Sequence, residues 1–316
     1  MSTMWNRREW LKTAGVTAAA LTCGVTARAD LRETAKKKIH LAVFTGPYGG
    51  LPVAEAARKI KADGFGGVVC EYSFADARFN PLQPDWALAD KISASLAQEG
   101  IKIVGLYGYF NVVHPDAAKR KEGEDRMAFL LANWKRLGSP IVATETGTLN
   151  HESEWAESPE NETEAGYQQC RAAIGRLVAL AKKSGAVVAI EPYWRNIIGS
   201  SERTQRLFRD ESSSSLKLIM DPCNYFRKEE LAHMEPILKD IFKRVGKHTV
   251  LAHAKDVKPA ATGTDLPAAG QGVLDYPLYL RLLAGLNRDL YLALEHLTLE
   301  EVPASRDYVL QQFEKI

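Results

Sequence analysis

Four apolar segments in the second half of the chain each end on a side chain that can bind a metal ion. The four terminal residues are Glu191, Asp221, His253 and Glu295. They follow one another at intervals of roughly 30 to 40 residues, the length of one strand and helix with their loops. In a barrel of alternating strands and helices, every strand ends at the same face, where active sites lie. We therefore expect one imidazole and three carboxylates to meet there and bind a divalent metal.

Each of these four residues also has a structural explanation when it is taken alone. Glu191 and Asp221 both precede a proline, so each could simply end a strand or begin a turn. His253 could be a core histidine, and Glu295 could pair with the neighbouring His296. Four successive segments that place an ionisable group at the same end nevertheless favour a shared site over four coincidences.

One imidazole and three carboxylates form an oxygen-rich ligand set. Such a set suits one divalent ion, with Mn²⁺ as the first choice and Mg²⁺, Co²⁺ or Zn²⁺ as alternatives. A substrate with adjacent carbonyl and hydroxyl oxygens could chelate the ion, which would polarise the carbonyl and stabilise an enediolate. Glu191 and Glu295 lie on the fifth and eighth expected strands. From opposite flanks of the site, the two carboxylates could remove and return a proton next to the carbonyl.

The elements that would position these residues alternate along the whole chain. The helix-like stretches are amphipathic, and three of them end at a glycine before the next strand, at Gly64, Gly100 and Gly185. Eight strands with intervening helices predict a single-domain (β/α)₈ TIM barrel, whereas an open doubly wound sheet lacks its G-x-G-x-x-G motif here. The strands are short and apolar on both faces, as in a buried parallel sheet, and are expected at 39–44, 67–71, 101–107, 141–144, 187–191, 216–221, 249–253 and 290–295.

The first 29 residues predict a cleaved export signal. The twin-arginine pattern Asn-Arg-Arg-Glu-Trp-Leu-Lys at 6–12 precedes an apolar run, and Ala-Arg-Ala at 27–29 fits a cleavage site. We expect export by the twin-arginine machinery, cleavage after Ala29, and a mature protein in the periplasm or outside the cell. Residues 30–37 would then form a short polar linker, and residues 38–316 would form the barrel.

The overall composition is that of a globular protein and excludes several function classes. The formal net charge is only +2, which gives no support for a nucleic-acid partner. No stretch after the first 29 residues approaches the apolar length of a membrane span. Cleavage would leave three cysteines, Cys70, Cys170 and Cys223, and an odd number leaves at least one unpaired. The oligomeric state is left open.

The strand ends carry motifs that resemble the xylose-isomerase-like TIM-barrel superfamily of sugar isomerases and epimerases. The motifs are Ile-Glu-Pro-Tyr-Trp at 190–194, Met-Asp-Pro-Cys-Asn at 220–224, His-Ala-Lys-Asp at 253–256, Gly-Gln-Gly-Val-Leu-Asp at 270–275 and Leu-Glu-His at 294–296. The likeness runs from about residue 38 to the C-terminus. It implies that Glu191, Asp221, His253 and Glu295 bind the metal, and that the two glutamates also move the proton. Asn224 stands where some relatives have a substrate-contacting histidine, which argues against simple ketohexose epimerisation.

Further residues near the strand ends are expected to contact a small carbohydrate substrate. Four of them have a structural alternative: helix capping for Glu71, a helix start for His114 and an ordinary ion pair for Lys255 with Asp256. Tyr109 and other aromatic residues could form an apolar floor, although packing is the commoner role of such side chains. The expected substrate contacts are Glu71, His114, Glu145, Trp194, Asn224, Lys255 and Asp256.

These observations predict an exported, metal-dependent sugar isomerase or epimerase that works through a metal-stabilised enediolate. The alternative is a lyase or hydrolase of 3-keto-glycosides that expels the aglycone by β-elimination, and the ligand set does not separate the two. A non-catalytic sugar-binding protein would not need the metal ligands. An abasic-site endonuclease, from the DNA-repair branch of the superfamily, would need a histidine-rich site and a basic stripe that the sequence lacks.

Overall fold

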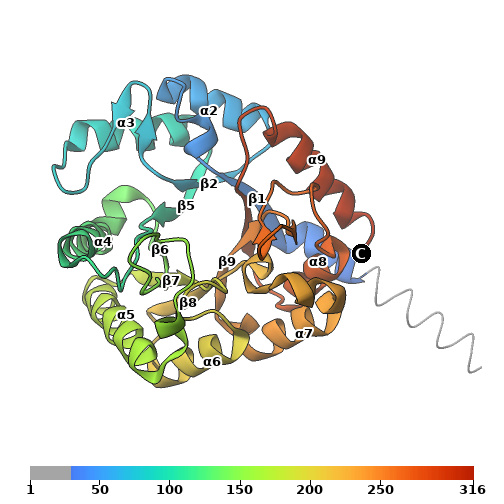
Figure 1. Ribbon diagram of the computed structural model, residues 1–316. Coiled ribbons are helices and arrows are strands. Elements are labelled where there is room, and N and C mark those ends of the chain that lie inside the picture. Colours follow the sequence, from blue (N-terminus) through green and yellow to red (C-terminus); the bar gives the residue numbers. More distant parts are fainter. Residues whose placement is uncertain (1–29) are drawn as a thin grey trace, which may run out of the picture.

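A computed structural model describes residues 30–316 as a closed barrel of eight parallel strands surrounded by helices (Figure 1). The last strand pairs with the first, with Ile39 opposite Leu290, and this pairing closes the barrel. The predicted single-domain TIM barrel is confirmed. The strands are β1 (Ile39–Phe44), β2 (Gly67–Cys70), β5 (Lys102–Tyr107), β6 (Ile141–Glu145), β7 (Val187–Glu191), β8 (Leu216–Met220), β9 (Thr249–Ala254) and β12 (Leu290–Leu294).

One long helix follows each barrel strand, and together these helices form the outer ring. The glycines that predicted helix ends, Gly64, Gly100 and Gly185, all have positive φ angles, a conformation that glycine adopts without strain. The helices are α2 (Val53–Ala62), α3 (Trp86–Gln98), α4 (Ala117–Leu137), α5 (Glu164–Ser184), α6 (Ser201–Asp210), α7 (Met234–Val245), α8 (Tyr276–Gly285) and α9 (Val302–Phe313).

The core consists of two apolar regions on the two faces of the strands. A large cluster fills the space between strands and helices, and a smaller one fills the inside of the barrel. This explains why the strand sequences are apolar on both faces. The smaller cluster fits inside the barrel because many of its side chains are small. It includes Ala42, Ala143, Ala189 and Ala293 beside the larger Val69, Ile219 and Leu251.

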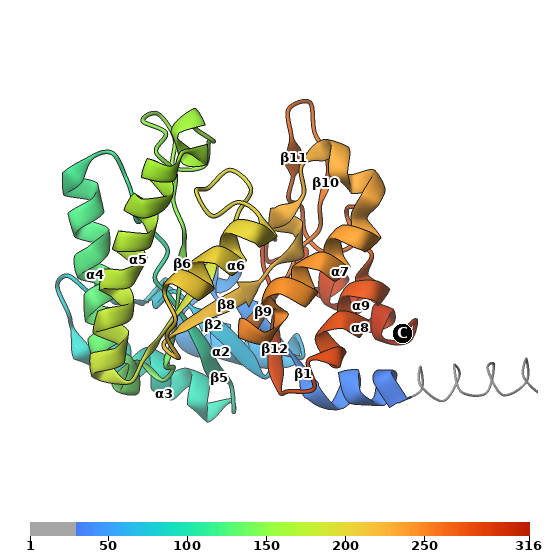
Figure 2. The ribbon, with the colours of Figure 1, turned by 90° about the horizontal axis from the view of Figure 1, so that it is seen from below.

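The longest connections lie on the side where the strands end (Figure 2). They include the hairpin β10–β11 (Lys258–Pro259 and Thr264–Asp265) and the loop after β6. A smaller hairpin, β3–β4 (Ser73–Phe74 and Ala77–Arg78), follows β2. The segment expected to be loop-like, 149–166, is irregular except for the 3₁₀ helix η2 (Pro159–Glu162) and the start of α5.

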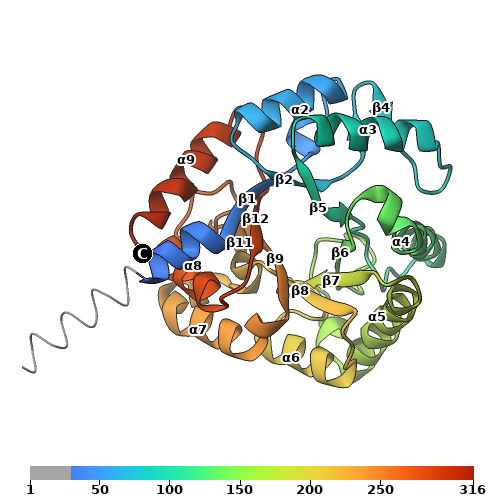
Figure 3. The ribbon, with the colours of Figure 1, turned by 180° about the vertical axis from the view of Figure 1, so that it is seen from behind.

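Residues 30–38 form a helix, which corrects the expectation of a linker at 30–37. Leu31 packs against the core, Ala35 is fully buried, and Lys36 Nζ lies 2.6 Å from Glu314 Oε1. Leu31 and Ala35 are one helical turn apart and therefore lie on one face of the helix. The sequence pattern did not reveal this face because the residues around these two are mostly polar. The helix lies on the side opposite the long loops (Figures 2 and 3).

Two further expectations concern the termini and the cysteines. The predicted export signal, residues 1–29, lies outside the described residues. From residue 30 onward, the chain contains no helix long and apolar enough to span a membrane. Cys70, Cys170 and Cys223 are all buried and free, in agreement with the expectation that at least one thiol is unpaired.

Candidate metal centre and active site

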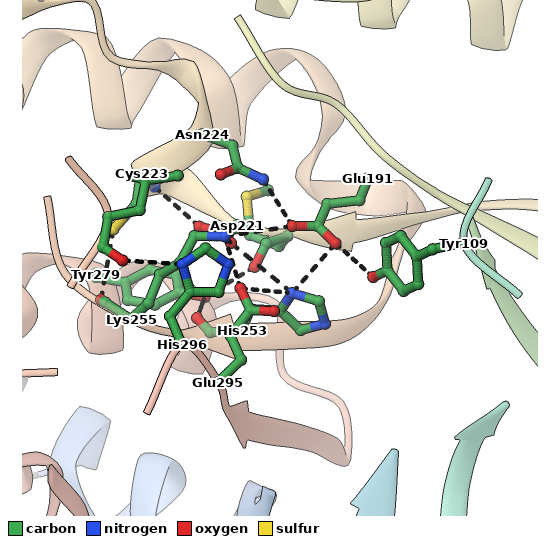
Figure 4. A network of polar contacts seen from close by, with 12 residues as sticks. Tyr109, Glu191, Asp221, Cys223, Asn224, His253, Lys255, Tyr279, Glu295 and His296 are labelled. Carbon is green, nitrogen blue, oxygen red and sulfur yellow. Dashed lines mark hydrogen bonds and ion pairs between the residues drawn. The ribbon is translucent and has the colours of Figure 1, made fainter. Parts of the chain in front are cut away.

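The four predicted metal ligands meet where the strands end. Each offers one ligand atom, and these atoms all lie within 4.8 Å of one another in a buried cluster (Figure 4). Glu191 is the last residue of β7 and His253 lies near the end of β9, while Asp221 and Glu295 directly follow β8 and β12. The residues come together because parallel barrel strands end at one face.

The unsatisfied polar atoms of this cluster fit a divalent metal. His253 Nδ1 lies 3.3 Å from Glu295 Oε1, 3.4 Å from Glu191 Oε2 and 3.7 Å from Asp221 Oδ2. In the described part of the chain, neither imidazole nitrogen nor Asp221 Oδ2 makes a hydrogen bond. Buried polar atoms are normally paired. A metal ion bound by these atoms would remove the deficit, and the mixture of one nitrogen and three carboxylates suits such an ion.

An ammonium group lies against the same carboxylates. Lys255 Nζ is 2.6 Å from both Asp221 Oδ2 and Glu295 Oε1, and 3.6 Å from Glu191 Oε1. The contact with Glu295 is a hydrogen bond, whereas the contact with Asp221 is an ion pair. Three carboxylates match the charge of one divalent ion plus one ammonium group. Lys255 therefore belongs to the charge balance of the site.

Both glutamates of the cluster are ionised at neutral pH. Burial by itself raises the pKa of Glu191, but the charges of His253 and Lys255 outweigh it and hold the pKa at about 2. The same balance lowers the pKa of Glu295 well below its usual value. Two hydrogen bonds orient Glu191: Asn224 Nδ2 donates to Oε1 at 2.6 Å, and the Tyr109 hydroxyl donates to Oε2. Ionised carboxylates can serve both as metal ligands and as bases.

A cavity of about 600 Å³ opens above the cluster. Glu191 and Glu295 line it, and so do four of the seven predicted substrate contacts: Glu71, Glu145, Asn224 and Lys255. Sequence reasoning located these residues because each stands at a strand end or shortly after one.

Glu145 is the least satisfied of these lining residues. It is the last residue of β6, its Cα is paired with that of Glu191, and its side chain is only 4% exposed. Among the described residues, neither of its carboxyl oxygens has a hydrogen-bond partner. Burial, reinforced by the charges of Glu154 and Glu191, raises the pKa of Glu145 to about 8. At neutral pH this carboxyl is therefore mostly protonated and can donate a hydrogen bond to a substrate oxygen.

The other three predicted substrate contacts lie outside the cavity lining. Trp194 is 5% exposed, and its Nε1 donates to Thr264 Oγ1 at 3.2 Å, which ties it to the β10–β11 hairpin. Asp256 is fully buried and accepts hydrogen bonds from backbone N–H groups, including those of Gly270 and Leu274. Both side chains hold loops in place.

His114 borders a separate, smaller cavity of about 210 Å³ beside the loop after β6. Its Nδ1 accepts a hydrogen bond from the Asp116 N–H, and its Nε2 lies 3.5 Å from Glu154 Oε1. The histidine thus supports the turn that begins α4, in agreement with the structural alternative.

The rest of the cavity wall was missed by sequence reasoning, apart from Tyr109. Tyr107 ends β5, so the strand-end rule could have found it. Most of the others come from loops, where residue spacing predicts no direction. The remaining side chains of the wall are those of Phe44, Pro47, Tyr107, Tyr109, Trp155, Tyr193, Leu266, His296 and Leu297.

Comparison with known protein families agrees with this geometry. The model of the xylose isomerase-like TIM barrel family matches residues 55–311. The chain belongs to the xylose isomerase-like TIM barrel family. A search with the sequence found no match among the curated proteins.

Solved structures with the same fold include a magnesium-bound protein and two named enzymes. One is a xylose isomerase-like TIM barrel protein from Mycobacterium smegmatis in complex with magnesium, 16% identical, with a TM-score of 0.63 over 89% of this chain and 98% of that one. A second is 3-keto-D-glucoside 4-epimerase YcjR from E. coli, 17% identical, with a TM-score of 0.60 over 88% and 99%. A third is the probable 3-DHS dehydratase AsbF from Bacillus anthracis, 13% identical, with a TM-score of 0.66 over 86% and 98%. At these identities the likeness shows a shared fold.

Proposed function

We propose that this member of the family is a metal-dependent enzyme that transfers a proton next to the carbonyl of a small carbohydrate, as sugar isomerases and epimerases do. The observation that carries the proposal is the buried cluster of Glu191, Asp221, His253 and Glu295 at the base of a cavity. The 3-keto-D-glucoside epimerase among the fold relatives supports the same class of chemistry. Mn²⁺ is the ion we propose, and Mg²⁺, Co²⁺ and Zn²⁺ suit the same ligands.

The residues of the site account for the proton transfer. When bound, the metal supplies Lewis acidity that polarises the substrate carbonyl. Glu191 or Glu295 then takes the proton from the neighbouring carbon, and the electrons of the C–H bond move toward the carbonyl oxygen. The Lys255 ammonium group lies beside both glutamates and can offset the negative charge. Return of the proton to the same carbon on its other face gives an epimer. Its return to the former carbonyl carbon, together with transfer of the neighbouring hydroxyl proton to the former carbonyl oxygen, gives an isomer.

Elimination from a 3-keto-glycoside is the second candidate, and Glu145 is the observation that favours it. After the same proton removal from C2, the C1–O bond breaks, and the departing aglycone oxygen needs a proton. Glu145 is adjacent to Glu191 and mostly protonated at neutral pH, so it can supply that proton. The dehydratase among the fold relatives, by its name, eliminates water.

Isotope exchange in D₂O distinguishes these reactions. The mature protein, loaded with Mn²⁺ and in parallel with Mg²⁺, is incubated with free ketoses and, separately, with a 3-keto-glycoside, and the products are followed by NMR after the metal is removed. Deuterium next to the carbonyl together with a new sugar indicates epimerisation or isomerisation, whereas release of the aglycone indicates elimination. The Glu191→Gln protein should show neither signal. If the wild-type protein, with metal confirmed bound, shows neither, the proposed substrate class is wrong.

A further inference from the structure

The cavity has a charged base and an apolar rim, and we infer that it binds a sugar that carries an aromatic substituent. The sugar would lie on the metal cluster and the aromatic group at the rim. This inference rests on the proposed function, because it takes the metal cluster as the place where the sugar binds. It adds the kind of substrate: an aryl glycoside whose sugar ring carries the keto group, in preference to a free monosaccharide.

All of the formally charged side chains that line the cavity come from the barrel. Each stands at the last residue of a strand or directly after it, and they are Glu71, Glu145, Glu191, Lys255 and Glu295. Two polar groups of this base lack partners within the described chain: the Glu145 carboxyl and Asn224 Oδ1. Sugar hydroxyl groups can both donate and accept hydrogen bonds, so they can satisfy both groups.

The loops contribute a different kind of surface to the same cavity. Apart from the imidazole of His296, their lining side chains are uncharged, and they include Pro47, Trp155, Tyr193, Leu266 and Leu297. The apolar side chains among them come from the connections after β1, β6, β7 and β12 and from the stretch that follows β11. They therefore surround the cavity mouth from several directions.

Two large aromatic side chains of this wall are open to solvent. Trp155 is 58% exposed and Tyr107 is 40% exposed, and both line the cavity. The Tyr107 and Tyr109 rings have centroids 4.8 Å apart, and Tyr109 donates its hydroxyl hydrogen bond to Glu191. One aromatic wall thus runs from the metal cluster to the rim. Exposed aromatic surface next to a polar site is typical of ligand binding.

The size of the cavity agrees with a two-part ligand. Its volume of about 600 Å³ lies within the range of ~300–1,000 Å³ that holds drug-sized molecules. A single sugar ring on the metal cluster would leave the apolar rim in contact with water. An aromatic aglycone attached to that sugar would cover the rim and stack against Trp155 or Tyr107.

Equilibrium binding of two glycosides tests this inference. Two unoxidised glycosides, 4-nitrophenyl β-D-glucoside and methyl β-D-glucoside, stand in for the keto-glycosides because they lack the carbonyl and cannot be turned over. Their dissociation constants from the Mg²⁺-loaded protein are measured by saturation-transfer NMR titration. We expect the aryl glycoside to bind about tenfold more tightly, as stacking on an aromatic wall would provide. Trp155→Ala and Tyr107→Ala should each reduce this preference by weakening aryl glycoside binding more than methyl glucoside binding. Trp155→Phe should retain most of it.

Leu82→Ala serves as the matched control, because Leu82 is as exposed as Tyr107 and does not line the cavity. Equal affinity for the two glycosides, no binding of either, or a preference unaffected by both alanine variants would overturn the inference. Its failure is distinct from failure of the proposed function. Deuterium exchange into ketoses without an aryl preference would support the proposed function and overturn the inference. An aryl preference without deuterium exchange or aglycone release would support the inferred binding and overturn the proposed function.

Discussion

At the scale of single residues, the site is a problem of charge balance in a buried cluster. One imidazole and one ammonium group each lie within ion-pair distance of the same three carboxylates, and all five groups are buried. Isolated charges of one sign are costly to bury, so the cluster needs positive charge. Lys255 provides one such charge, and a divalent metal would provide the rest. The following predictions separate the two contributions.

Asp221→Asn should remove the metal while keeping the fold. Asp221 Oδ1 accepts the hydrogen bond from the Cys223 N–H at 3.0 Å, and asparagine can keep this cap. The lost carboxylate charge should weaken metal affinity by more than ~100-fold, the upper cost of losing a group that only supports a ligand. Metal content after dialysis is the measurement, and Glu154→Gln is the control. If Asp221→Asn keeps a stoichiometric amount of metal, as the control should, the four-residue site is wrong.

Lys255→Met should tighten metal binding and destabilise the metal-free protein. The ammonium group repels a metal cation bound beside it. Two unit charges about 4 Å apart near a protein surface interact by about 4 kcal/mol, and about one third of this energy corresponds to a tenfold change in affinity. Removing the ammonium group from beside Asp221 and Glu295 should therefore lower the metal Kd by about tenfold or more. Competition with a metal indicator measures the Kd, and thermal unfolding in chelator measures the second effect. Lys255→Arg keeps the positive charge and should not tighten metal binding. If the Met variant binds metal no better than wild type, repulsion between the ammonium group and the metal ion does not limit metal affinity.

The protonated state of Glu145 should appear as a pH dependence of stability. In the unfolded chain this carboxyl releases its proton near its usual pKa of 4.5, whereas in the folded protein it keeps the proton up to about pH 8. The folded state thus binds the extra proton between these values, and its contribution to stability is lost as the pH rises from 4.5 to 8. Relative to wild type, Glu145→Gln should gain about 1 kcal/mol or more between pH 5 and pH 8. Urea unfolding at both pH values measures this, and parallel pH profiles would refute it.

At the scale of elements, two asparagines tie together the loops around the cavity. Asn111, after β5, donates from Nδ2 to the Thr148 carbonyl at 2.8 Å and accepts at Oδ1 from the Thr148 N–H. Asn161 accepts from the Leu149 N–H at 2.8 Å and donates to Thr148 Oγ1 and to the Arg195 carbonyl. The loop that carries Trp155 is thereby linked to the loops on both sides.

Asn161→Ala should loosen this loop without unfolding the barrel. The change leaves buried backbone groups unpaired, at a cost of about 1–3 kcal/mol. We expect faster hydrogen exchange at 149–163 and weaker binding of an aryl glycoside, with little change at β7 or β8. Hydrogen-exchange mass spectrometry measures the first effect. Asn133→Ala, on α4, is the control, and unchanged exchange at 149–163 in Asn161→Ala would contradict the role assigned to this side chain.

The strand pattern was predictable because buried parallel strands are apolar on both faces and are separated by glycine-ended helices. Every barrel strand lies within about two residues of its expected position. The two hairpins escaped prediction because strands of two residues have no periodicity to detect. The helix at 30–38 escaped because only Leu31 and Ala35 mark its apolar face.

The site was predictable only where the barrel itself determines direction. Side chains alternate along a strand, so His253 and Lys255 point to one side, while the neighbouring Asp256 points away and holds a loop. Asp256 was therefore assigned to the site because it is next to Lys255 in the sequence, although its side chain points away from the site. Trp155 and Leu297 stand in loops, where no such rule applies, and their place at the cavity follows only from the folded chain.

At the scale of the whole molecule, the barrel must close before the site exists. The four proposed metal ligands come from β7, β8, β9 and β12 and the positions directly after them, and they extend over a hundred residues of the chain, from Glu191 to Glu295. The helix at 30–38 belongs to the same folded unit through Ala35 and the ion pair of Lys36 with Glu314. A cut directly before residue 30 would thus leave every described contact of the barrel intact. Export of a protein that is already folded and metal-loaded is compatible with this arrangement.

We propose that the protein is exported by the twin-arginine pathway and cleaved after Ala29. Replacing Arg7 and Arg8 together by lysine should retain the precursor in the cytoplasm, because the paired arginines form the recognised pattern. Arg28→Lys is the control and should be exported normally. Cell fractionation with N-terminal sequencing checks both variants, and the exported wild-type protein should begin at Asp30. Its thermal unfolding should match that of the full chain, since the helix that follows the cut packs on the barrel; export of the double-lysine variant at the wild-type level would contradict the proposed route.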